Sequence, residues 1–468
     1  MALQRSVGMG LQSFMRTSRK SLSDVLGSKG ALATRIHVFL GNEAADPDSI
    51  VSSLCSAYLS HCERGTGAGY GDTTTEGTVA CVPMCCIPRS DLALRRDTKL
   101  LFDMAGLDIN DLICLDDNEE YGYDALHELQ RRGLLSITLT DHNALASSVW
   151  SADATATLGS CVVEIIDHHT DKGEHAHVVG ARRDIAFDAE RGRELVGSAC
   201  TLIAERALGP ITIDPRSAKG SGEQGSTIEV DGELAMLLSG VILLDTSNMD
   251  PTVDKGRPRD DSALSRLLQA AQAEVAARGG REAMYVELQG AKSSPEFWTD
   301  LSAADALRLD YKRFQVEPNL KGEEDSARER PRPRFLGMSS LILPVSSLLD
   351  KPDVHTSLQG YLNTAAVPVD LLVCMCMVLV SGDRRNARRE LLAVGSAAQL
   401  DALATFLSTD EGAVTMAVER MGERLVIEAE VERGGVLADA YRQGNVRMSR
   451  KQVGPILERF LSTVCPEK

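Results

Sequence analysis

Acidic and amide side chains occur at an unusual spacing in HVFLGNEAADPDSIVSSLCSAYL, residues 37–59. Asn42, Asp46 and Asp48 separate an apolar run from a stripe of apolar residues at helical spacing. Two carboxylates one residue apart repel each other, and a helix N-terminus needs only one of them as a cap. Carboxylate oxygens are the ligands that hard divalent cations prefer. The spacing therefore predicts a turn that binds divalent metal ions.

Further metal-type ligands follow three later apolar runs. Asp141 lies in LTDHN, Asp167-His168-His169 in IIDHH, and Asp245 in VILLDTSNMD. Each alone is more often a helix cap or a turn residue than a ligand. We predict that all of them end strands of one parallel sheet, where ligands collect at the carboxyl ends. Two ions bridged by carboxylates would supply a hydroxide nucleophile and neutralise a phosphoryl oxygen.

The elements that must position these ligands alternate between short β-rich runs and helical patterns over residues 35–250. Such alternation predicts an α/β fold with a parallel, doubly wound sheet. The predicted strands are 36–41, 79–87, 111–117, 134–143 and 161–169. A smaller second α/β domain follows, with strands at 335–345, 369–380 and 390–395 and helices at 398–408 and 450–463. We place the boundaries so that 1–34 is an extension, 35–300 the first domain and 301–468 the second.

Composition excludes some classes of protein. A net charge of −17 and an aromatic content of 4% argue against binding of nucleic acid. The longest uncharged apolar run, 371–380, is too short to cross a bilayer, which predicts no membrane span. Eleven cysteines without a zinc-like Cys-x-x-Cys pair indicate reduced thiols and a cytoplasmic location. The acid-free first 23 residues are compatible with a mitochondrial presequence, although we favour a polar extension.

The motifs resemble those of a known superfamily. GNEAADPDS, DHN, IDHH and LLDTSNMD, in this order, are similar to the four signatures of the DHH phosphoesterases. IPRSDLALRRD, LDYKRF and RRELLAVG resemble its cytosolic exopolyphosphatase and prune-like branch, and SRKQVGPIL also resembles family II inorganic pyrophosphatases. The resemblance covers residues 36–463 except for loop inserts at 63–77, 215–227 and 250–261. It implies a metal-binding catalytic domain, a substrate-binding domain with a mixed sheet, and an active site in the cleft between them.

The resemblance also implies roles for individual residues. The implied ligands of two divalent ions, Mg or Mn with Co or Zn as substitutes, are Asp46, Asp48, Asp141, His168 and Asp245. Asp141 and Asp245 would bridge the ions, His169 would face the substrate phosphate, and Asp167 would orient the histidines. The implied catalytic residues are Asp141, His168, His169 and Asn42.

Two positions point to different substrates. Asn42 stands where pyrophosphatases have a metal-binding histidine and exopolyphosphatases an asparagine. His142, in DHN, follows the pyrophosphatase form instead. These two residues leave the balance between long and short substrates open.

The second domain would contribute cations that bind substrate together with His169. The matching motifs place Lys312, Arg389, Arg450 and Lys451 there. Guanidinium groups suit phosphate oxygens, and a local basic channel in an acidic protein would admit a polyanion selectively. Arg95 and Arg96 are equally compatible with structural and substrate roles.

These features predict a metal-dependent exopolyphosphatase that releases terminal orthophosphate from linear inorganic polyphosphate. The alternatives are an inorganic pyrophosphatase or a hydrolase of short polyphosphates or nucleotides, and a prune-like scaffold protein with little turnover. The nuclease branch of the superfamily carries a Gly-Gly-Gly-His motif, which this sequence lacks.

Overall fold

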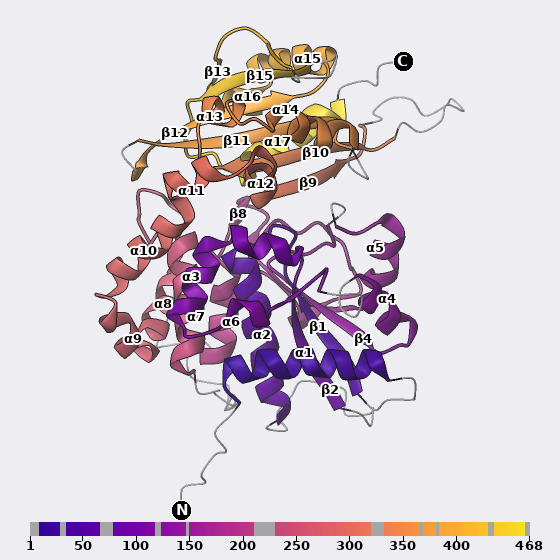
Figure 1. The fold of residues 1–468 in the computed structure, drawn as a ribbon, viewed down its shortest axis with the longest axis vertical. Coiled ribbons are helices and arrows are strands. Elements are labelled where there is room, and N and C mark those ends of the chain that lie inside the picture. Colours follow the sequence, from indigo (N-terminus) through magenta and orange to yellow (C-terminus); the bar gives the residue numbers. More distant parts are fainter. Residues whose placement is uncertain are drawn as a thin grey trace, which may run out of the picture. The chain divides into compact units, whose positions relative to one another are not determined.

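The computed structural model describes residues 9–28, 34–65, 78–117, 123–146, 149–209, 230–319, 332–364, 368–380, 383–428 and 435–463. The chain forms two compact units, Met1–Lys292 and Ser293–Lys468 (Figure 1). The sequence-based boundary at residue 300 lies eight residues further along the chain. Most of the insert at 63–77 and all of the insert at 215–227 lie outside the described residues.

The first unit is built on a six-stranded parallel sheet in the order β3-β2-β1-β4-β5-β6. The strands are β1 (Thr34–Leu40), β2 (Thr78–Cys85), β3 (Ile113–Cys114), β4 (Leu135–Thr140), β5 (Val162–Asp167) and β6 (Arg183–Ile185). β1 and β4 are hydrogen-bonded neighbours although β2 and β3 come between them along the chain. The strand order therefore reverses between β1 and β4, which is where ligands bind in open α/β sheets. The α/β prediction is confirmed, although β3 is much shorter than the predicted strand.

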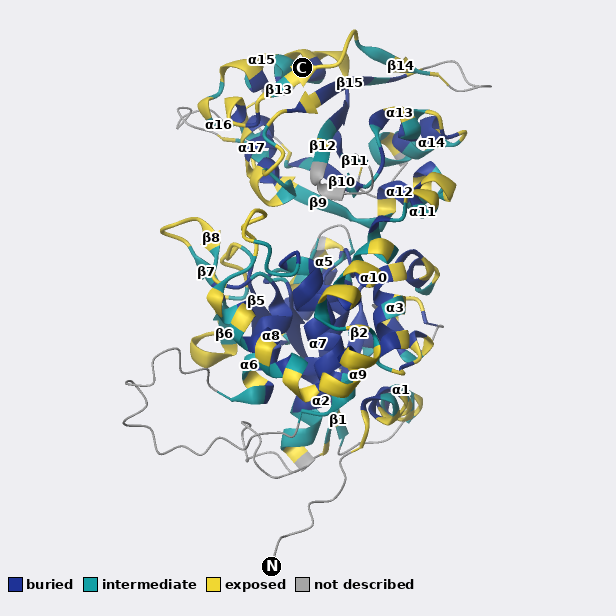
Figure 2. Cartoon of the chain, turned by 90° about the vertical axis from the view of Figure 1, so that its left-hand side faces the viewer, coloured by how far each residue is buried: buried dark blue, intermediate teal, exposed yellow. Residues whose placement is uncertain are grey.

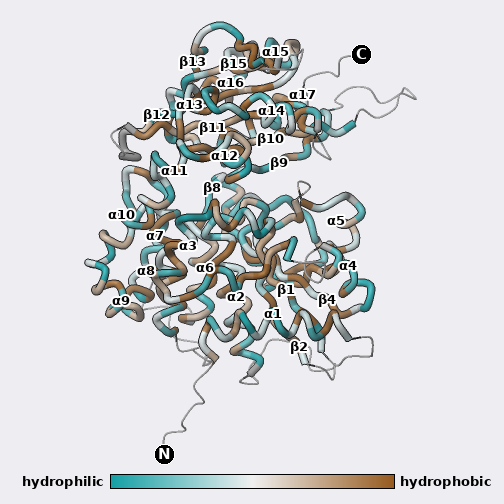
Figure 3. The backbone as a smooth tube through the Cα atoms, in the orientation of Figure 1, coloured by the Kyte–Doolittle hydropathy of each residue, from teal (hydrophilic) through white to brown (hydrophobic). Residues whose placement is uncertain are grey.

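Helices cover both faces of this sheet, because its strands are buried and apolar on both sides. One hydrophobic cluster holds residues of α2 (Pro47–Gly65), α6 (Ala199–Leu208), α7 (Gly232–Asp245) and α8 (Pro258–Ala270). The other holds residues of α4 (Tyr123–Arg131) and α5 (Ala152–Gly159). Most of α7 is buried and coloured dark blue in Figure 2, since it has hydrophobic residues all round. Figure 3 shows the same arrangement as hydrophobic central strands and hydrophilic outer loops.

Residues 11–27, placed in an N-terminal extension on sequence grounds, form helix α1 (Leu11–Gly27) of the first unit. Its buried side chains are Leu11, Phe14, Met15, Ser18, Leu22 and Val25, which follow helical spacing. The Ser18 hydroxyl donates to the carbonyl of Cys81 on β2 at 2.9 Å, and Arg19 pairs with Asp117 at 3.0 Å. The basic residues of this segment therefore flank an apolar stripe that packs on the sheet.

The second unit is built on a mixed sheet in the order β13-β15-β12-β11-β10-β9, with β14 paired to β15. Its strands are β9 (Tyr311–Val316), β10 (Arg334–Leu341), β11 (Leu371–Val380), β12 (Asp383–Val394), β13 (Val418–Arg420), β14 (Leu425–Ile427) and β15 (Val436–Gln443). β10 and β11 are parallel, whereas the other pairs are antiparallel. Helices α15 (Ala397–Thr409) and α17 (Arg450–Thr463) lie where the sequence predicted helices. Among the described residues, no helix has the length and hydropathy that a membrane span requires.

Candidate metal centre

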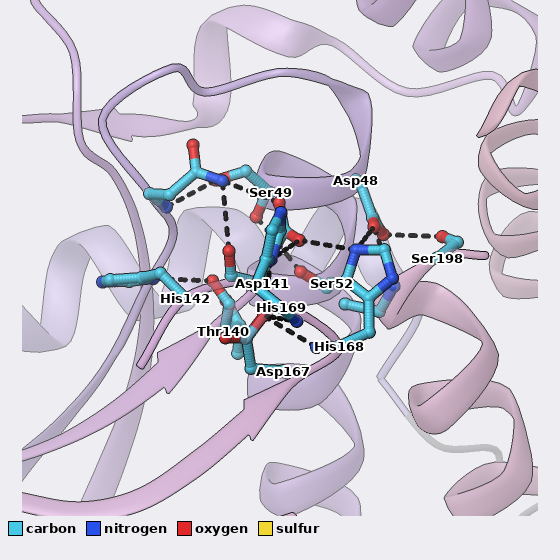
Figure 4. Close-up of polar contacts among 12 residues, drawn as sticks. Asp48, Ser49, Ser52, Thr140, Asp141, His142, Asp167, His168, His169 and Ser198 are labelled. Atoms are coloured by element: carbon cyan, nitrogen blue, oxygen red, sulfur yellow. Dashed lines mark hydrogen bonds and ion pairs between the residues drawn. The ribbon is translucent and has the colours of Figure 1, made fainter. Parts of the chain in front are cut away.

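The reversal of strand order brings Asp141, His168 and His169 into one site, with Asp48 beside them (Figure 4). Asn42 follows β1, Asp141 follows β4, and His168 and His169 follow β5. Ligand atoms of Asp141, His168 and His169 all lie within 4.8 Å of one another. An edge of this kind, with a carboxylate between two imidazoles, has the donor set of a transition-metal site.

Asp141 lies at the centre of the group and is 2% exposed. Its backbone has a φ of +62°, a left-handed conformation that costs a non-glycine residue of order 1–3 kcal/mol. Its Oδ1 lies 3.3 Å from His168 Nε2, and its Oδ2 accepts a hydrogen bond of 2.7 Å from the Asn42 amide. Aspartate is one of the few residues that tolerate such a turn, so the strained position aims a carboxylate at the histidines.

His168 is held in the tautomer that suits a ligand. Its Nδ1 lies 3.0 Å from the carbonyl oxygen of Val196, and because a carbonyl can only accept, Nδ1 carries the proton. In the neutral ring the lone pair is then on Nε2, which faces Asp141 and also Asp48 Oδ2 at 3.7 Å. This carbonyl–histidine arrangement is the usual support of a metal-binding imidazole.

Asp48, in the first turn of α2, joins this helix to α6. Its Oδ1 accepts from the Ser198 hydroxyl at 2.7 Å and from the Cys200 amide at 2.9 Å. Its Oδ2 accepts from the Ala199 amide at 2.7 Å. One buried carboxylate thus caps the N-terminus of α6 while it faces His168.

Asp167 accepts hydrogen bonds from both histidines, in agreement with the orienting role expected from the sequence. Its Oδ1 accepts from the backbone amides of His168 and His169 and, at 2.8 Å, from His169 Nδ1. Its Oδ2 accepts from the Asn143 amide at 2.6 Å. Burial acts to raise the pKa of Asp167, but His169, His168 and Asn143 outweigh it and hold this pKa well below its usual range. Asp167 is therefore held in its ionised form, and both of its oxygens accept hydrogen bonds from the protein.

Asn42 was predicted to be catalytic, and its described side-chain contacts are with Asp141 and with the backbone of its own turn. Its amide oxygen accepts from the backbone amides of Ala44 at 2.9 Å and Ala45 at 3.2 Å. Its amide nitrogen donates to Asp141 Oδ2 and to the Asp141 carbonyl. The described contacts thus make Asn42 a residue that shapes the turn and positions Asp141.

Asp245 does not end a strand, and that part of the prediction is wrong. It is the last residue of helix α7, because the apolar run before it is long enough to form a fully buried helix. The carboxyl end of a helix carries partial negative charge and favours a cation. Oδ2 of Asp245 is buried and has no hydrogen-bond partner among the described residues. Asp46 caps α2 through its Oδ1, which accepts from the Ser49 amide at 3.0 Å.

The acidic side chains affect one another's protonation. Burial, followed by the charge of Asp141, raises the pKa of Asp48 to about 7. Burial, followed by the charges of Asp48 and Asp46, raises the pKa of Asp245 to about 8. A buried group of carboxylates, one oxygen of which is unpaired, requires positive charge to be ionised together. Asp46, Asp48, Asp141, His168 and Asp245 therefore fit the divalent ions that the sequence implies.

The metal-free protein is expected to lose stability as the pH rises from about 4 to about 8. In this window the native state keeps the protons of Asp48 and Asp245, whereas the unfolded chain has already released them. Thermal unfolding in chelator should show a midpoint that falls by at least about 2 °C. Saturating Mn²⁺ should abolish this fall, since it neutralises the carboxylates. If the unfolding midpoint depended on pH in the same way with and without Mn²⁺, Asp48 and Asp245 would not be metal ligands.

Comparisons with known proteins agree with this geometry. Residues 286–460 match the DHHA2 domain family. The chain is 25% identical to exopolyphosphatase PRUNE1 of Mus musculus over 457 residues, which are 97% of this chain and 79% of the mouse protein. It is 26% identical to human exopolyphosphatase PRUNE1, with 91% of this chain and 76% of the human protein covered. The second unit therefore matches the DHHA2 domain family, and most of the chain is similar to proteins named exopolyphosphatase.

A solved structure of related fold supports the same conclusion. The crystal structure of a putative family II inorganic pyrophosphatase from Methanococcus jannaschii matches with a TM-score of 0.50 and 20% identity. The match covers 91% of this chain and 99% of that chain. The likeness in fold therefore extends over both units. Together with the family model and the relatives, it confirms the resemblance predicted from the sequence.

The DHHA2 domain contains the four predicted substrate-binding cations. Lys312 is half-buried on β9, and Lys451 is exposed in the first turn of α17. Arg389 on β12 donates from Nε to the carbonyl of Val446 at 2.7 Å. Arg450 donates to the carbonyl and to Oδ1 of Asp310, both at 2.6 Å. The guanidinium groups of Arg389 and Arg450 thus already have protein partners.

The sequence left the role of Arg95 open and gave no signal for Asp260, because nothing in their spacing marks the contacts that they make in the site. Buried Arg95, left open between two roles, donates to the carbonyls of Ala44 at 2.6 Å and Ala45 at 2.9 Å, so it holds the first ligand turn. Arg96 is exposed. Asp260, fully buried in α8, accepts from the Gly197 amide at 2.8 Å and from the Thr201 hydroxyl at 2.6 Å.

Asp260→Ala is expected to lower the affinity for Mn²⁺ about 10–100-fold. Gly197 lies between Val196, which accepts from His168, and Ser198, which donates to Asp48, so loosening it releases both ligands. Asp260→Asn keeps one acceptor oxygen and should restore most of the affinity. Calorimetric titration of metal measures both variants, with the exposed neighbour Asp261→Ala as control. Unchanged affinity in Asp260→Ala would exclude this role.

Proposed function

We propose that this chain is a metal-dependent phosphoanhydride hydrolase, and specifically an exopolyphosphatase that releases terminal orthophosphate from linear inorganic polyphosphate. The observation that carries the proposal is the cluster of buried Asp141 and His168 with half-buried His169 at the switch point, with Asp48 and Asp245 near them. Similarity to proteins named exopolyphosphatases over most of the chain supports it.

The residues of the first unit have distinct roles in the proposed reaction. Asp46, Asp48, Asp141, His168 and Asp245 would hold two divalent ions, Mg or Mn, with Co or Zn as substitutes. When bound, these ions supply activated water and positive charge for the phosphoryl oxygens. Asn42 and Asp167 keep the Asp141 carboxylate and the histidines in place.

His169 is suited to contact the substrate phosphate. Its side chain is 27% exposed, and Asp167 accepts from its Nδ1, so that Nε2 is left to face a ligand. The Asp167 anion stabilises a positively charged imidazole, which allows His169 to bind the phosphate or to give a proton to the leaving group at Nε2. We assign substrate contacts in the DHHA2 domain to Lys312, Arg389, Arg450 and Lys451.

A second candidate function is hydrolysis of pyrophosphate, short polyphosphates or nucleotides. His142 and the fold likeness to a family II pyrophosphatase favour it. A scaffold protein with little turnover is the candidate of another class, and the complete set of acidic ligands argues against it. We also propose a reducing, cytoplasmic location, which the free thiols of all described cysteines support.

The deciding experiment measures orthophosphate release from long-chain polyphosphate, tripolyphosphate, pyrophosphate and ATP, and release of mononucleotide from a cyclic nucleotide and an oligonucleotide. Each is tested with Mg²⁺, Mn²⁺, Co²⁺ or Zn²⁺ and in chelator. We expect release from polyphosphate with metal and none in chelator. Preference for pyrophosphate would favour the second candidate, and a comparable rate on the oligonucleotide would overturn the proposal. Absence of turnover on every substrate would favour the scaffold.

A further inference from the structure

A hollow of about 410 Å³ lies in the DHHA2 domain, where β12 and β15 meet the turn before α17. Its lining residues are Arg388, Arg442, Gln443, Gly444 and Val446. The volume lies within the range of about 300–1,000 Å³ that is typical of small-ligand sites. None of its arginines belongs to the four substrate-binding cations assigned above.

The two arginines of the hollow lie on the same face of the sheet. Glu390 on β12 is paired with Arg442 on β15, and residues two apart along a strand share a face. Arg388 is therefore a diagonal neighbour of Arg442, within about 7–8 Å between backbones. Both side chains are exposed, so their guanidinium groups reach a ligand from solvent.

Two acidic residues lie opposite Arg442 on the neighbouring strands, Glu390 on β12 and Glu419 on β13. Glu390, the carboxylate on the same face, accepts from the Val345 amide at 2.9 Å. Arg442 has a long ion pair of 3.9 Å with exposed Glu419, a type that contributes little. Within the described part of the chain, Arg388 has no ion pair. Two guanidinium groups beside one hollow make an anion site in a protein whose net charge is −17.

The wall of the hollow is held in place by hydrogen bonds. Arg389 donates to the Val446 carbonyl at 2.7 Å, and the Gly444 amide donates to the Ala417 carbonyl at 2.8 Å. A side-chain carbon at position 444 would lie 2.9 Å from that same carbonyl oxygen, so glycine is required there. The concave surface is thus preformed, which lowers the cost of binding a ligand.

We propose that this hollow binds internal phosphates of a polyphosphate chain, away from the end that is hydrolysed. The inference rests on the proposed function and adds a subsite that selects long chains. Guanidinium groups bind phosphate oxygens through paired N–H donors, and a linear polyphosphate presents such oxygens at every unit. The proposal predicts that a substrate too short to reach the hollow gains no affinity from it.

The test compares the full-length wild type with Arg388→Ala/Arg442→Ala. The matched control is Arg191→Ala/Arg308→Ala, which removes two exposed arginines that pair with acids three residues away in sequence. Steady-state kinetics on long-chain polyphosphate and tripolyphosphate give KM and kcat for each protein. We expect KM for long chains to rise at least about tenfold in the hollow variant, the effect of one lost charge-assisted hydrogen bond. KM for tripolyphosphate and kcat on both substrates should match the control.

Equilibrium binding separates failure of the subsite from failure of the enzymatic proposal. Binding of long-chain polyphosphate to metal-free protein is measured at low and high salt, with orthophosphate as the short competitor. The wild type should bind more tightly than the hollow variant, and the difference should shrink at high salt. If the protein hydrolyses none of the substrates, this binding measurement alone tests the subsite. Equal binding by the two proteins, or an equal rise in KM for long and short substrates, would overturn the subsite.

Discussion

Asp141→Asn is expected to lower kcat/KM for polyphosphate by at least about 1,000-fold, since several kcal/mol of transition-state stabilisation would depend on the ions that we propose this residue holds. Asparagine has the same shape, and it tolerates the φ of +62° at this position. The Asn42 contact can be kept through the amide oxygen. The change therefore removes one negative charge from a position where Asp141 faces His168 at 3.3 Å.

The measurement pairs phosphate release at saturating metal with far-ultraviolet circular dichroism. Asp103→Asn, on the exposed side of α3 (Arg96–Met104), removes the same charge where it pairs only with Lys99 and serves as control. A purely structural role for Asp141 predicts lost stability with catalysis retained. Retention of more than about a tenth of the wild-type rate would mean that Asp141 does not hold the ions.

The strand ends of the site could be predicted because their signal is local. A ligand directly after an apolar run is visible in sequence, and a parallel sheet brings such ends to one edge. Asn42, Asp141 and His168 are of this kind, and the reversal between β1 and β4 places them together. The strand order itself is a long-range property that no local pattern contains.

Other features could not be predicted because they depend on tertiary packing, which the spacing of residues in the sequence does not reveal. Asp245 follows an apolar run that fits a buried helix as well as a buried strand. The run forms helix α7 because the rest of the first unit packs around it on every side. Helix α1 was taken for a polar extension because its arginines and serines hide a buried stripe. Arg95 and Asp260 contact backbone groups far along the chain, so their roles follow only from the folded structure.

Asp245→Asn is expected to stabilise the metal-free protein and to abolish its stabilisation by metal. Burial and neighbouring acids raise the pKa of Asp245 to about 8, so above this pH the native state holds an unfavourable charge that the substitution removes. Below about pH 6 the wild-type side chain is protonated, and the two proteins should unfold at nearly the same temperature. Loss of the ligand should also lower turnover of polyphosphate by at least about 100-fold.

Asp245→Asn should raise the stability of the metal-free protein and lower its gain in stability from metal. This pair of opposite effects distinguishes a metal ligand from an acid with a purely structural role. The free energy of unfolding of the wild-type protein should rise by about 2.7 kcal/mol when Mn²⁺ is present at 100 times its dissociation constant. That of the variant should hardly change. Asp231→Asn, at the other end of α7, removes the same charge but keeps an oxygen for the Leu234 amide that it caps. This control should bind metal like the wild type. If Asp245→Asn destabilised the metal-free protein at high pH, the buried oxygen would have a structural partner, and Asp245 would not hold an ion.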